Sequence, residues 1–364
     1  MARKSEVVVA RCIIRAILKS DDQNQKKSLL KRIIAWLAAF FALYKILLHK
    51  FQPILFADLR KRAWHIDEAR YSGSFIAEDG ANEEDSLQTM DAMGYSGSTF
   101  FSTKDQTYLI KSIPRQFEHS FFRDDLLGPY AEYMAEHQDS LLIRICDLLA
   151  ARSTTLGIAF GLAPSHHIVM ENLLYGQAEA QRKGEPAWES WDLKPINYFF
   201  PERDIASGTL ASEATKSKLA DKFDDKLMLR NEDAEQFIRT LERDTALLQD
   251  RNAVDYSLFL VRIRKGAIDP FQDPEIIPDD APFVPPASPS WRTGIPSTDG
   301  IHIYRAAVLD FFWAKHKMQP RLMTALIKAY NLLDRQGHMS ITTSPTEYRT
   351  RFLDMCRSFI EVSE

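Results

Sequence analysis

The most constraining feature of this sequence is an aspartate between a predicted helix and a predicted strand. Residues 231–250 carry apolar side chains at helical spacing, with Asn231 in a position to cap the helix. Residues 256–263 are mainly apolar and predict a strand. Asp255 lies between the two elements. A carboxylate there can accept the proton of a substrate hydroxyl, or it can cap a turn and have no chemical role.

A glycine-containing run precedes a predicted hairpin in the first third of the chain. The run is Gly94-Tyr95-Ser96-Gly97-Ser98, and two β-rich segments follow it around the polar residues 104–106. Small residues let backbone N–H groups approach phosphate oxygens, and Lys111 in the second segment could reach the same phosphates. The run lacks Walker A spacing. Taken alone, it is equally compatible with a glycine turn followed by an exposed lysine.

A second acid, Asp310, ends the apolar run of residues 303–309. A magnesium ion that bridges ATP phosphates requires hard oxygen ligands, which a carboxylate in this position can supply. The alternative is that Asp310 caps a helix. The chain therefore presents a glycine loop, a lysine, a catalytic acid and a metal-binding acid in the order in which kinases use them.

These motifs resemble those of the phosphatidylinositol phosphate kinase family, and the resemblance covers residues 51–362. Asp255-Tyr256-Ser257-Leu258 is the most specific match, and Val308-Leu309-Asp310 resembles the metal-binding motif. Asp192-Leu193-Lys194 is similar to the start of the family's Asp-Leu-Lys-Gly-Ser signature. The resemblance implies an α+β, two-lobed lipid-kinase fold with antiparallel sheets, helices and an ATP cleft between the lobes.

The resemblance also implies roles for individual residues. Lys111 would position the phosphates of ATP, and Glu118 would orient Lys111. Asp255 would accept the proton of the inositol hydroxyl, Lys194 would contact the γ-phosphate, and Asp310 would hold Mg²⁺. The remaining ATP-binding residues would be Gly94, Ser96, Gly97, Ser98, Met170, Glu171, Asn172 and Leu173. The region implied in lipid specificity comprises Arg321, Met323, Lys328, Arg335 and His338.

Departures from the family pattern leave three activities open. Pro195 and Ile196 replace the Gly-Ser of the signature, and the basic residues expected beyond them are missing. The first candidate activity is 5-phosphorylation of phosphatidylinositol 4-phosphate, which gives phosphatidylinositol 4,5-bisphosphate. The second is 5-phosphorylation of phosphatidylinositol 3-phosphate, because residues 170–176 resemble that subfamily's hinge. The third is a catalytically weak scaffold that binds phosphoinositides.

The charge distribution predicts a partner for the N-terminal arm, residues 1–50. Residues 1–62 contain 14 Lys/Arg and 4 Asp/Glu, a net charge of +10. Because the whole chain has a net charge of −4, residues 63–364 carry −14. An anionic cytosolic membrane leaflet would attract such an arm. Nucleic acid is not expected, because no binding motif accompanies the charge. We therefore expect a cytoplasmic protein that is peripheral on the cytosolic face of membranes.

Residues 33–48 are apolar except for Lys45 and predict a helix. Its 16 residues would span about 24 Å, short of the roughly 30 Å hydrocarbon core. The helix would pack on the body of the protein, join two copies in a homodimer, or lie in the membrane interface. No signal peptide is expected, since the apolar run begins too late and no small-residue cleavage site follows.

The remaining organisation predicts an arm at 1–50, an N-terminal lobe at 51–174 and a C-terminal lobe at 175–364. Residues 77–92 predict a polar loop, and residues 201–229 a charged connection. Eight of the 17 prolines lie between residues 265 and 300, so 266–300 predicts a disordered or polyproline insertion outside the core. That insertion would be a neutral surface loop or a docking segment. Three scattered cysteines form no disulfide or zinc pattern, which suits a reducing cytoplasm.

Overall fold

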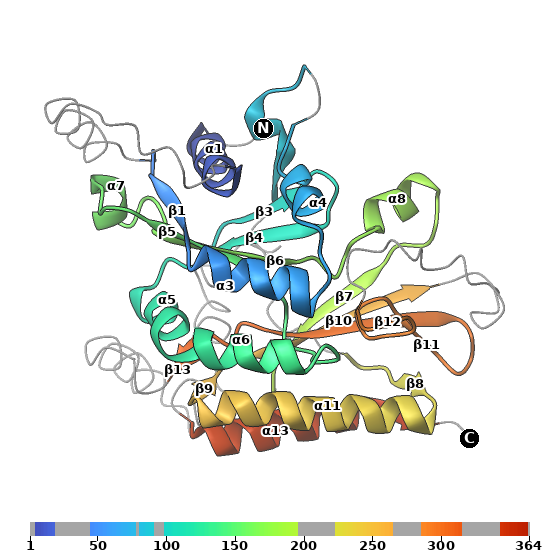
Figure 1. Cartoon of the computed structure of the whole chain (residues 1–364). Coiled ribbons are helices and arrows are strands. Elements are labelled where there is room, and N and C mark those ends of the chain that lie inside the picture. The colour runs from blue at the N-terminus through green and yellow to red at the C-terminus, as the bar shows by residue number, and fades with distance from the viewer. Residues whose placement is uncertain are drawn as a thin grey trace, which may run out of the picture. The chain divides into compact units, whose positions relative to one another are not determined.

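The computed structural model describes residues 4–18, 44–77, 80–90, 98–195, 223–264, 285–314 and 343–362. These residues belong to two compact units. The first unit is drawn from 1–116 and 144–175, and the second from 117–143 and 176–364. Both combine antiparallel strands with helices (Figure 1), which confirms the predicted α+β class.

The first unit contains a six-stranded antiparallel sheet in the order β1-β5-β6-β4-β3-β2. The predicted hairpin is present as β3 and β4, whose register places Phe100 opposite Lys111. The prediction of a loop at 77–92 is wrong for its centre, because Glu83–Ser86 forms a 3-10 turn and β2 follows it. The β2 backbone pairs with β3, a long-range contact that local polarity does not reveal. The strands are β1 (Leu48–Phe51), β2 (Leu87–Met90), β3 (Phe100–Thr103), β4 (Tyr108–Ser112), β5 (Ile145–Ala151) and β6 (His166–Glu171).

The described residues of the first unit form four α-helices: α1 (Lys4–Leu18), α3 (Pro53–Asp58), α4 (Glu68–Gly73) and α7 (Leu156–Ala159). A π-helical turn, Leu59–Ala63, extends α3. The predicted helix at 33–48 is wrong at its C-terminal end, because residues 44–47 are not helical and Leu48 begins β1. Residues 33–43 lie outside the described part of the chain.

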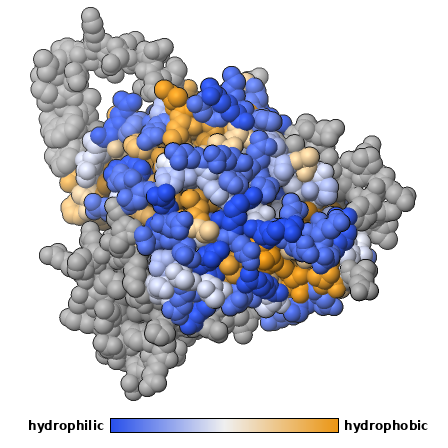
Figure 2. Space-filling view, turned by 60° about the horizontal axis from the view of Figure 1, so that its bottom comes forward, coloured by the Kyte–Doolittle hydropathy of each residue, from blue (hydrophilic) through white to orange (hydrophobic). Residues whose placement is uncertain are grey.

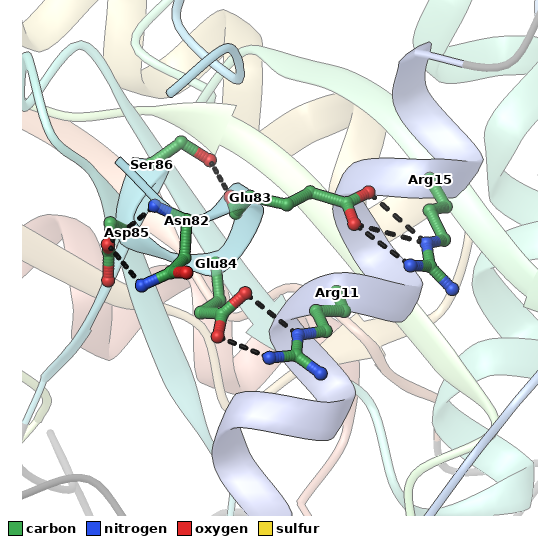
Figure 3. Close-up of polar contacts among 7 residues, drawn as sticks. All are labelled: Arg11, Arg15, Asn82, Glu83, Glu84, Asp85 and Ser86. Atoms are coloured by element: carbon green, nitrogen blue, oxygen red, sulfur yellow. Dashed lines mark hydrogen bonds and ion pairs between the residues drawn. The ribbon is translucent and has the colours of Figure 1, made fainter. Parts of the chain in front are cut away.

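Helix α1, which the sequence did not predict, is held on the first unit by ion pairs with the 3-10 turn (Figure 3). The guanidinium of Arg11 donates to the carboxylate of Glu84, with a distance of 2.8 Å from Nε to Oε2. Arg15 Nη2 lies 3.0 Å from Oε2 of Glu83. The apolar face of α1 includes Ile13 and Ile14, which are fully buried. The first 18 residues of the predicted arm thus include a helix packed within the unit.

The second unit contains a four-stranded sheet in the order β11-β12-β10-β7 and two short two-stranded pairs, β13-β9 and parallel β14-β8. Helices α11 and α13 lie side by side in Figure 1 and contact each other. The strands are β7 (Glu189–Leu193), β8 (Leu227–Leu229), β9 (Ala253–Val254), β10 (Ser257–Arg264), β11 (Ile295–Pro296), β12 (His302–Leu309), β13 (Trp313–Ala314) and β14 (Ile360–Val362). Among its described residues, the α-helices are α5 (Gln116–Phe121), α6 (Leu127–Glu136), α8 (Gln177–Arg182), α11 (Asn231–Asp250) and α13 (Pro345–Ser358).

The helix and strand predicted on either side of Asp255 are both confirmed, as α11 and β10. The predicted cap is displaced by one position. Arg230 has the extended backbone of the capping residue, and Asn231 is the first helical residue. Asn231 Nδ2 donates to Oε1 of Glu235 at 2.9 Å, so this side chain supports the first turn in place of capping it.

The proline-rich stretch contributes to the core of the second unit, so its predicted exclusion from the core is wrong for residues 290–297, all of which are buried. Trp291, Arg292 and Ile295 are buried. The guanidinium of Arg292 donates to the carbonyls of Ser140 and Leu142, the latter at 2.8 Å. Composition did not reveal this, because the buried residues are interspersed among prolines and polar residues. Residues 265–284 lie outside the described part of the chain. In the charged connection, residues 227–229 form β8.

Among the coloured residues in Figure 2, polar and charged side chains predominate, and hydrophobic residues gather in separate patches. Among the described residues, the most exposed large apolar side chains are Ile54 and Phe160, at 79% and 70%. Single apolar side chains are normal on protein surfaces. No helix in the described ranges is long and apolar enough to span a membrane.

Candidate active site

Three strand ends in the second unit place charged residues at one edge of the four-stranded sheet. Lys194 follows the last residue of β7, Asp255 lies two residues before the first residue of β10, and Asp310 follows the last residue of β12. The register aligns these ends, because Leu193 lies opposite Leu258 and Ser257 opposite Leu309. Strand pairing therefore brings together the catalytic and metal-binding acids and the lysine predicted from the sequence.

A second pair of hydrogen-bonded strands, the β9–β13 ladder, also positions the two acids. Val254 of β9 pairs with Trp313 of β13, whereas Ser257 of β10 pairs with Leu309 of β12. Asp255 and Asp310 consequently lie in short connections between two ladders. Their φ angles are 65° and 62°, in the left-handed region that aspartate tolerates better than most residues. Such conformations persist where the surrounding structure over-determines them.

Lys194 forms an ion pair with Asp255. Its Nζ lies 3.1 Å from Oδ2, and the two side chains are 24% and 15% exposed. Burial lowers the pKa of Lys194, but the carboxylates of Asp255, Asp192 and Asp310 together outweigh burial and raise the pKa above its ordinary value. Lys194 is therefore cationic at neutral pH, and it lies within the electrostatic reach of three carboxylates.

Helix α13 supports the connection that carries Asp255. The Tyr348 hydroxyl donates to the backbone carbonyl of Tyr256. The ring of Tyr256 packs edge-on against Tyr348 and Phe352, with centroids 4.8 and 4.9 Å away. All three aromatic residues are fully buried. The position of Asp255 is thus set by the core as well as by strand pairing.

Glu118, in α5, is buried with an exposed fraction of 7%. Its Oε1 accepts a hydrogen bond from Trp313 Nε1 at 2.8 Å. Trp313 lies three residues after Asp310 and was not singled out from the sequence. The only signal that could have drawn attention to it was the aromatic run Phe311-Phe312-Trp313 directly after the acid. The expected pairing of Glu118 with Lys111 stays a prediction.

The first unit carries the remaining described site residues. Lys111 is buried in β4, and its Nζ lies 5.4 Å from the ring centroid of Phe100. Ser98, Met170 and Leu173 are also buried. The structure therefore assigns Lys111 and the hinge to one unit, and Glu118, Lys194, Asp255 and Asp310 to the other.

The hinge side chains fix the local backbone. Glu171 Oε1 accepts from the backbone N–H of Arg144 at 3.0 Å. Asn172 Nδ2 donates to the carbonyl of Gln106 at 2.7 Å, and its Oδ1 accepts from the N–H of Leu174 at 3.0 Å. The Asn172–Gln106 bond holds the backbone that follows β6 against the turn between β3 and β4, and the Glu171 bond ties the end of β6 to the residue before β5.

Several predicted site residues lie outside the described part of the chain. In the glycine-rich run these are Gly94, Ser96 and Gly97, and in the specificity region they are Arg321, Met323, Lys328, Arg335 and His338.

The acids at the sheet edge suit magnesium. No group of three or more His, Cys, Asp or Glu side chains able to hold a metal ion occurs among the described residues. Magnesium is commonly held by one or two carboxylates together with substrate phosphates and water, so a larger protein cluster is not required. The hard carboxylate oxygens of Asp310 and its neighbours at this edge fit such an ion.

Comparison with protein families matches residues 81–276 to Phosphatidylinositol-4-phosphate 5-Kinase, which is more than half of the chain. The chain belongs to this family of lipid kinases. The match confirms the family predicted from the residues.

Individual relatives are distant and longer than the matched segment. Phosphatidylinositol 4-phosphate 5-kinase 4 of Arabidopsis thaliana is 25% identical over 226 residues, which cover 59% of this chain and 25% of that protein. Phosphatidylinositol 4-phosphate 5-kinase of Plasmodium falciparum is 25% identical over 224 residues, covering 60% and 12%. Phosphatidylinositol 4-phosphate 5-kinase-like protein 1 of Mus musculus is 26% identical over 165 residues, covering 45% and 37%. The matched segment thus spans well under half the length of each relative.

Proposed function

We propose that this chain transfers the γ-phosphoryl group of ATP to the 5-hydroxyl of phosphatidylinositol 4-phosphate, giving phosphatidylinositol 4,5-bisphosphate. The observation that carries the proposal is the Lys194–Asp255 ion pair at the sheet edge shared with Asp310. Family membership supports the reaction class. The names of the Arabidopsis and Plasmodium relatives support the choice of lipid.

In this mechanism, Asp255 accepts the proton of the inositol hydroxyl while that oxygen forms a bond to the γ-phosphorus. The bond between the γ-phosphorus and the β,γ-bridging oxygen breaks, and ADP leaves. Lys194 orients Asp255 through their ion pair and contacts the γ-phosphate with its positive charge. Asp310 would hold Mg²⁺, which would neutralise charge on the phosphates.

The other predicted residues would bind ATP. Lys111 would contact its phosphates and would be oriented by Glu118, while the glycine-rich run would cover the phosphates with backbone N–H groups. The hinge residues 170–173 would line the adenine pocket, and their backbone is already fixed by side-chain bonds. In this proposal, residues 51–174 would form the N-terminal kinase lobe and residues 175–364 the C-terminal lobe.

A second candidate, a weakly catalytic phosphoinositide-binding scaffold, is favoured by one described residue. Pro195 is buried directly after Lys194, where the family signature has glycine. Proline fixes φ near −65° and has no N–H to offer a phosphate. A third candidate, 5-phosphorylation of phosphatidylinositol 3-phosphate, rests on the hinge sequence at 170–176 alone.

The proposed setting is the cytosolic face of an anionic membrane. The protein would be cytoplasmic and peripheral, with its N-terminal arm attracted to anionic lipid. The arm could also join two copies in a homodimer.

In the decisive experiment, the full chain is incubated with magnesium, radiolabelled ATP and vesicles. Each vesicle preparation contains a single isomer of monophosphorylated phosphoinositide. The position of the new phosphate is then determined after deacylation. We expect the highest turnover with phosphatidylinositol 4-phosphate and a 4,5-bisphosphate product. Preference for phosphatidylinositol 3-phosphate would select the alternative lipid. Vesicle binding without transfer to any isomer would select the scaffold.

A further inference from the structure

Trp313 connects three of the proposed site residues within the second unit. Its backbone pairs with Val254, which directly precedes Asp255. It lies three residues after Asp310, and its indole N–H donates to the carboxylate of Glu118 at 2.8 Å. A single side chain and its peptide unit therefore contact both the loop of the proposed base and the proposed partner of Lys111.

We propose that Trp313 is a positioning residue for phosphoryl transfer, which acts by holding the Glu118 carboxylate. The proposal rests on the proposed function, in which Glu118 orients Lys111. It adds a residue to which no role was assigned from the sequence, and it links the metal-binding segment directly to α5.

The burial of both groups and the packing of a neighbouring ring strengthen this hydrogen bond. Trp313 and Glu118 are 8% and 7% exposed, so water competes little for either group. Hydrogen bonds to a charged acceptor are stronger than neutral ones, and a low local dielectric strengthens them further. The ring of Phe117 packs edge-on against Trp313 with centroids 4.7 Å apart, which restrains the indole plane. The indole N–H is thus preorganised toward Oε1 of Glu118.

The first test compares two tryptophan-to-phenylalanine variants. Trp313→Phe removes the indole N–H but keeps an aromatic ring beside Phe117. Trp291→Phe is the matched control, because the buried indole N–H of Trp291 has no hydrogen-bond partner within the described part of the chain. Both variants lose similar ring area, so a change in packing alone would affect them alike.

We expect Trp313→Phe to lower kcat about tenfold while KM for ATP changes less than about twofold, because a misplaced Glu118 acts mainly in the transition state. Trp291→Phe should retain kcat within about twofold. Equal losses of kcat in the two variants would overturn the positioning role.

A double-mutant cycle tests whether Trp313 acts through Glu118. In the Trp313→Phe background, Glu118→Gln should lower kcat much less than it does in the unmodified chain, because the link is already broken. Full additivity of the two losses would refute the coupling.

Spectroscopy separates this proposal from the proposed function. In ¹⁵N-tryptophan-labelled protein, Glu118→Gln should shift the indole N–H signal of Trp313 and leave that of Trp291 in place. The assignment comes from the two phenylalanine variants. An unmoved Trp313 signal would overturn the proposal even in an active kinase. If no lipid is phosphorylated, the proposed function fails, and the shift still decides whether Trp313 holds Glu118.

Discussion

At the scale of single residues, the site depends on two aspartates in an uncommon backbone conformation. Asp255 and Asp310 both have left-handed φ angles, and each lies in a connection between the same two ladders. The sequence predicted that each acid adjoins an apolar strand. It could not predict the left-handed backbone, because that conformation is imposed by pairing between residues about 55 positions apart in the chain.

Replacing Asp255 by asparagine tests its role as the proton acceptor. Asp255→Asn keeps the shape of the side chain but removes its negative charge. A positioned base contributes roughly 10²- to 10⁴-fold to rate, so lipid phosphorylation should fall at least about 100-fold. Binding of ATP with magnesium, measured by calorimetry, should persist. Asp250→Asn, an exposed aspartate five residues earlier, is the control and should retain activity. Full activity of Asp255→Asn would show that another group takes the proton.

At the scale of elements, the sequence predicted the helices and strands whose apolar or polar pattern is visible within a short stretch of residues. Helix α11 and strand β10 have clear apolar periodicity, and the β3–β4 hairpin is marked by its polar turn. Helix α1, strand β2 and the buried residues 290–297 were missed. Their positions depend on distant contacts, such as those of α1 with β1 and with the turn that carries Glu83 and Glu84, and those of Arg292 with the carbonyls of Ser140 and Leu142. The local spacing of apolar residues does not identify such distant partners.

The packing of α11 makes stability depend on pH through Asp244. This residue is fully buried, accepts from Tyr133 Oη and from the N–H of Leu141, both at 2.5 Å, and has its pKa raised by burial to about 6. A raised carboxyl pKa favours folding at low pH, where Asp244 is protonated. This contribution is lost as pH rises from its ordinary pKa of 3.8 through about 6.

The predicted magnitude follows from the size of this pKa shift. Between pH 4 and 7, the free energy of unfolding of the unmodified chain should fall relative to Asp244→Asn by on the order of 3 kcal/mol. Urea unfolding at successive pH values measures this difference. Asp250→Asn should show no such trend, since Asp250 is exposed on the same helix. A constant difference between the unmodified chain and Asp244→Asn would contradict the prediction.

Arg292 tests whether the end of the proline-rich stretch is part of the core. Arg292→Met retains much of the volume but leaves the carbonyls of Ser140 and Leu142 without this donor. Losing a buried charged donor should lower the free energy of unfolding by about 3 kcal/mol. Arg264→Met, at the exposed end of β10, should change it by less than about 0.5 kcal/mol. Equal values for the two variants would place Arg292 outside the cooperative core.

At the scale of the whole molecule, the charge is divided between a basic N-terminal segment and an acidic remainder. Arg11 and Arg15 are already paired with Glu84 and Glu83, so they contribute less to the attraction of an anionic surface (Figure 3). Deleting residues 1–50 would also remove α1 and most of β1 from the first unit. Charge substitution therefore tests membrane attraction more cleanly than deletion does.

Four basic residues at 26–32 offer that test: Lys26, Lys27, Lys31 and Arg32. Each basic residue near an anionic surface contributes roughly 1 kcal/mol to the free energy of membrane binding. Changing all four to glutamine should therefore weaken binding to phosphatidylserine vesicles by at least about tenfold. The control changes Lys104, Arg182, Lys183 and Arg239 to glutamine, four exposed residues that give the same change in net charge. Binding of the unmodified chain should weaken as salt rises, because salt screens the attraction. Unaltered, salt-insensitive binding by the 26–32 variant would show that the arm does not recruit the protein, whereas an equal loss in the control would assign recruitment to overall charge.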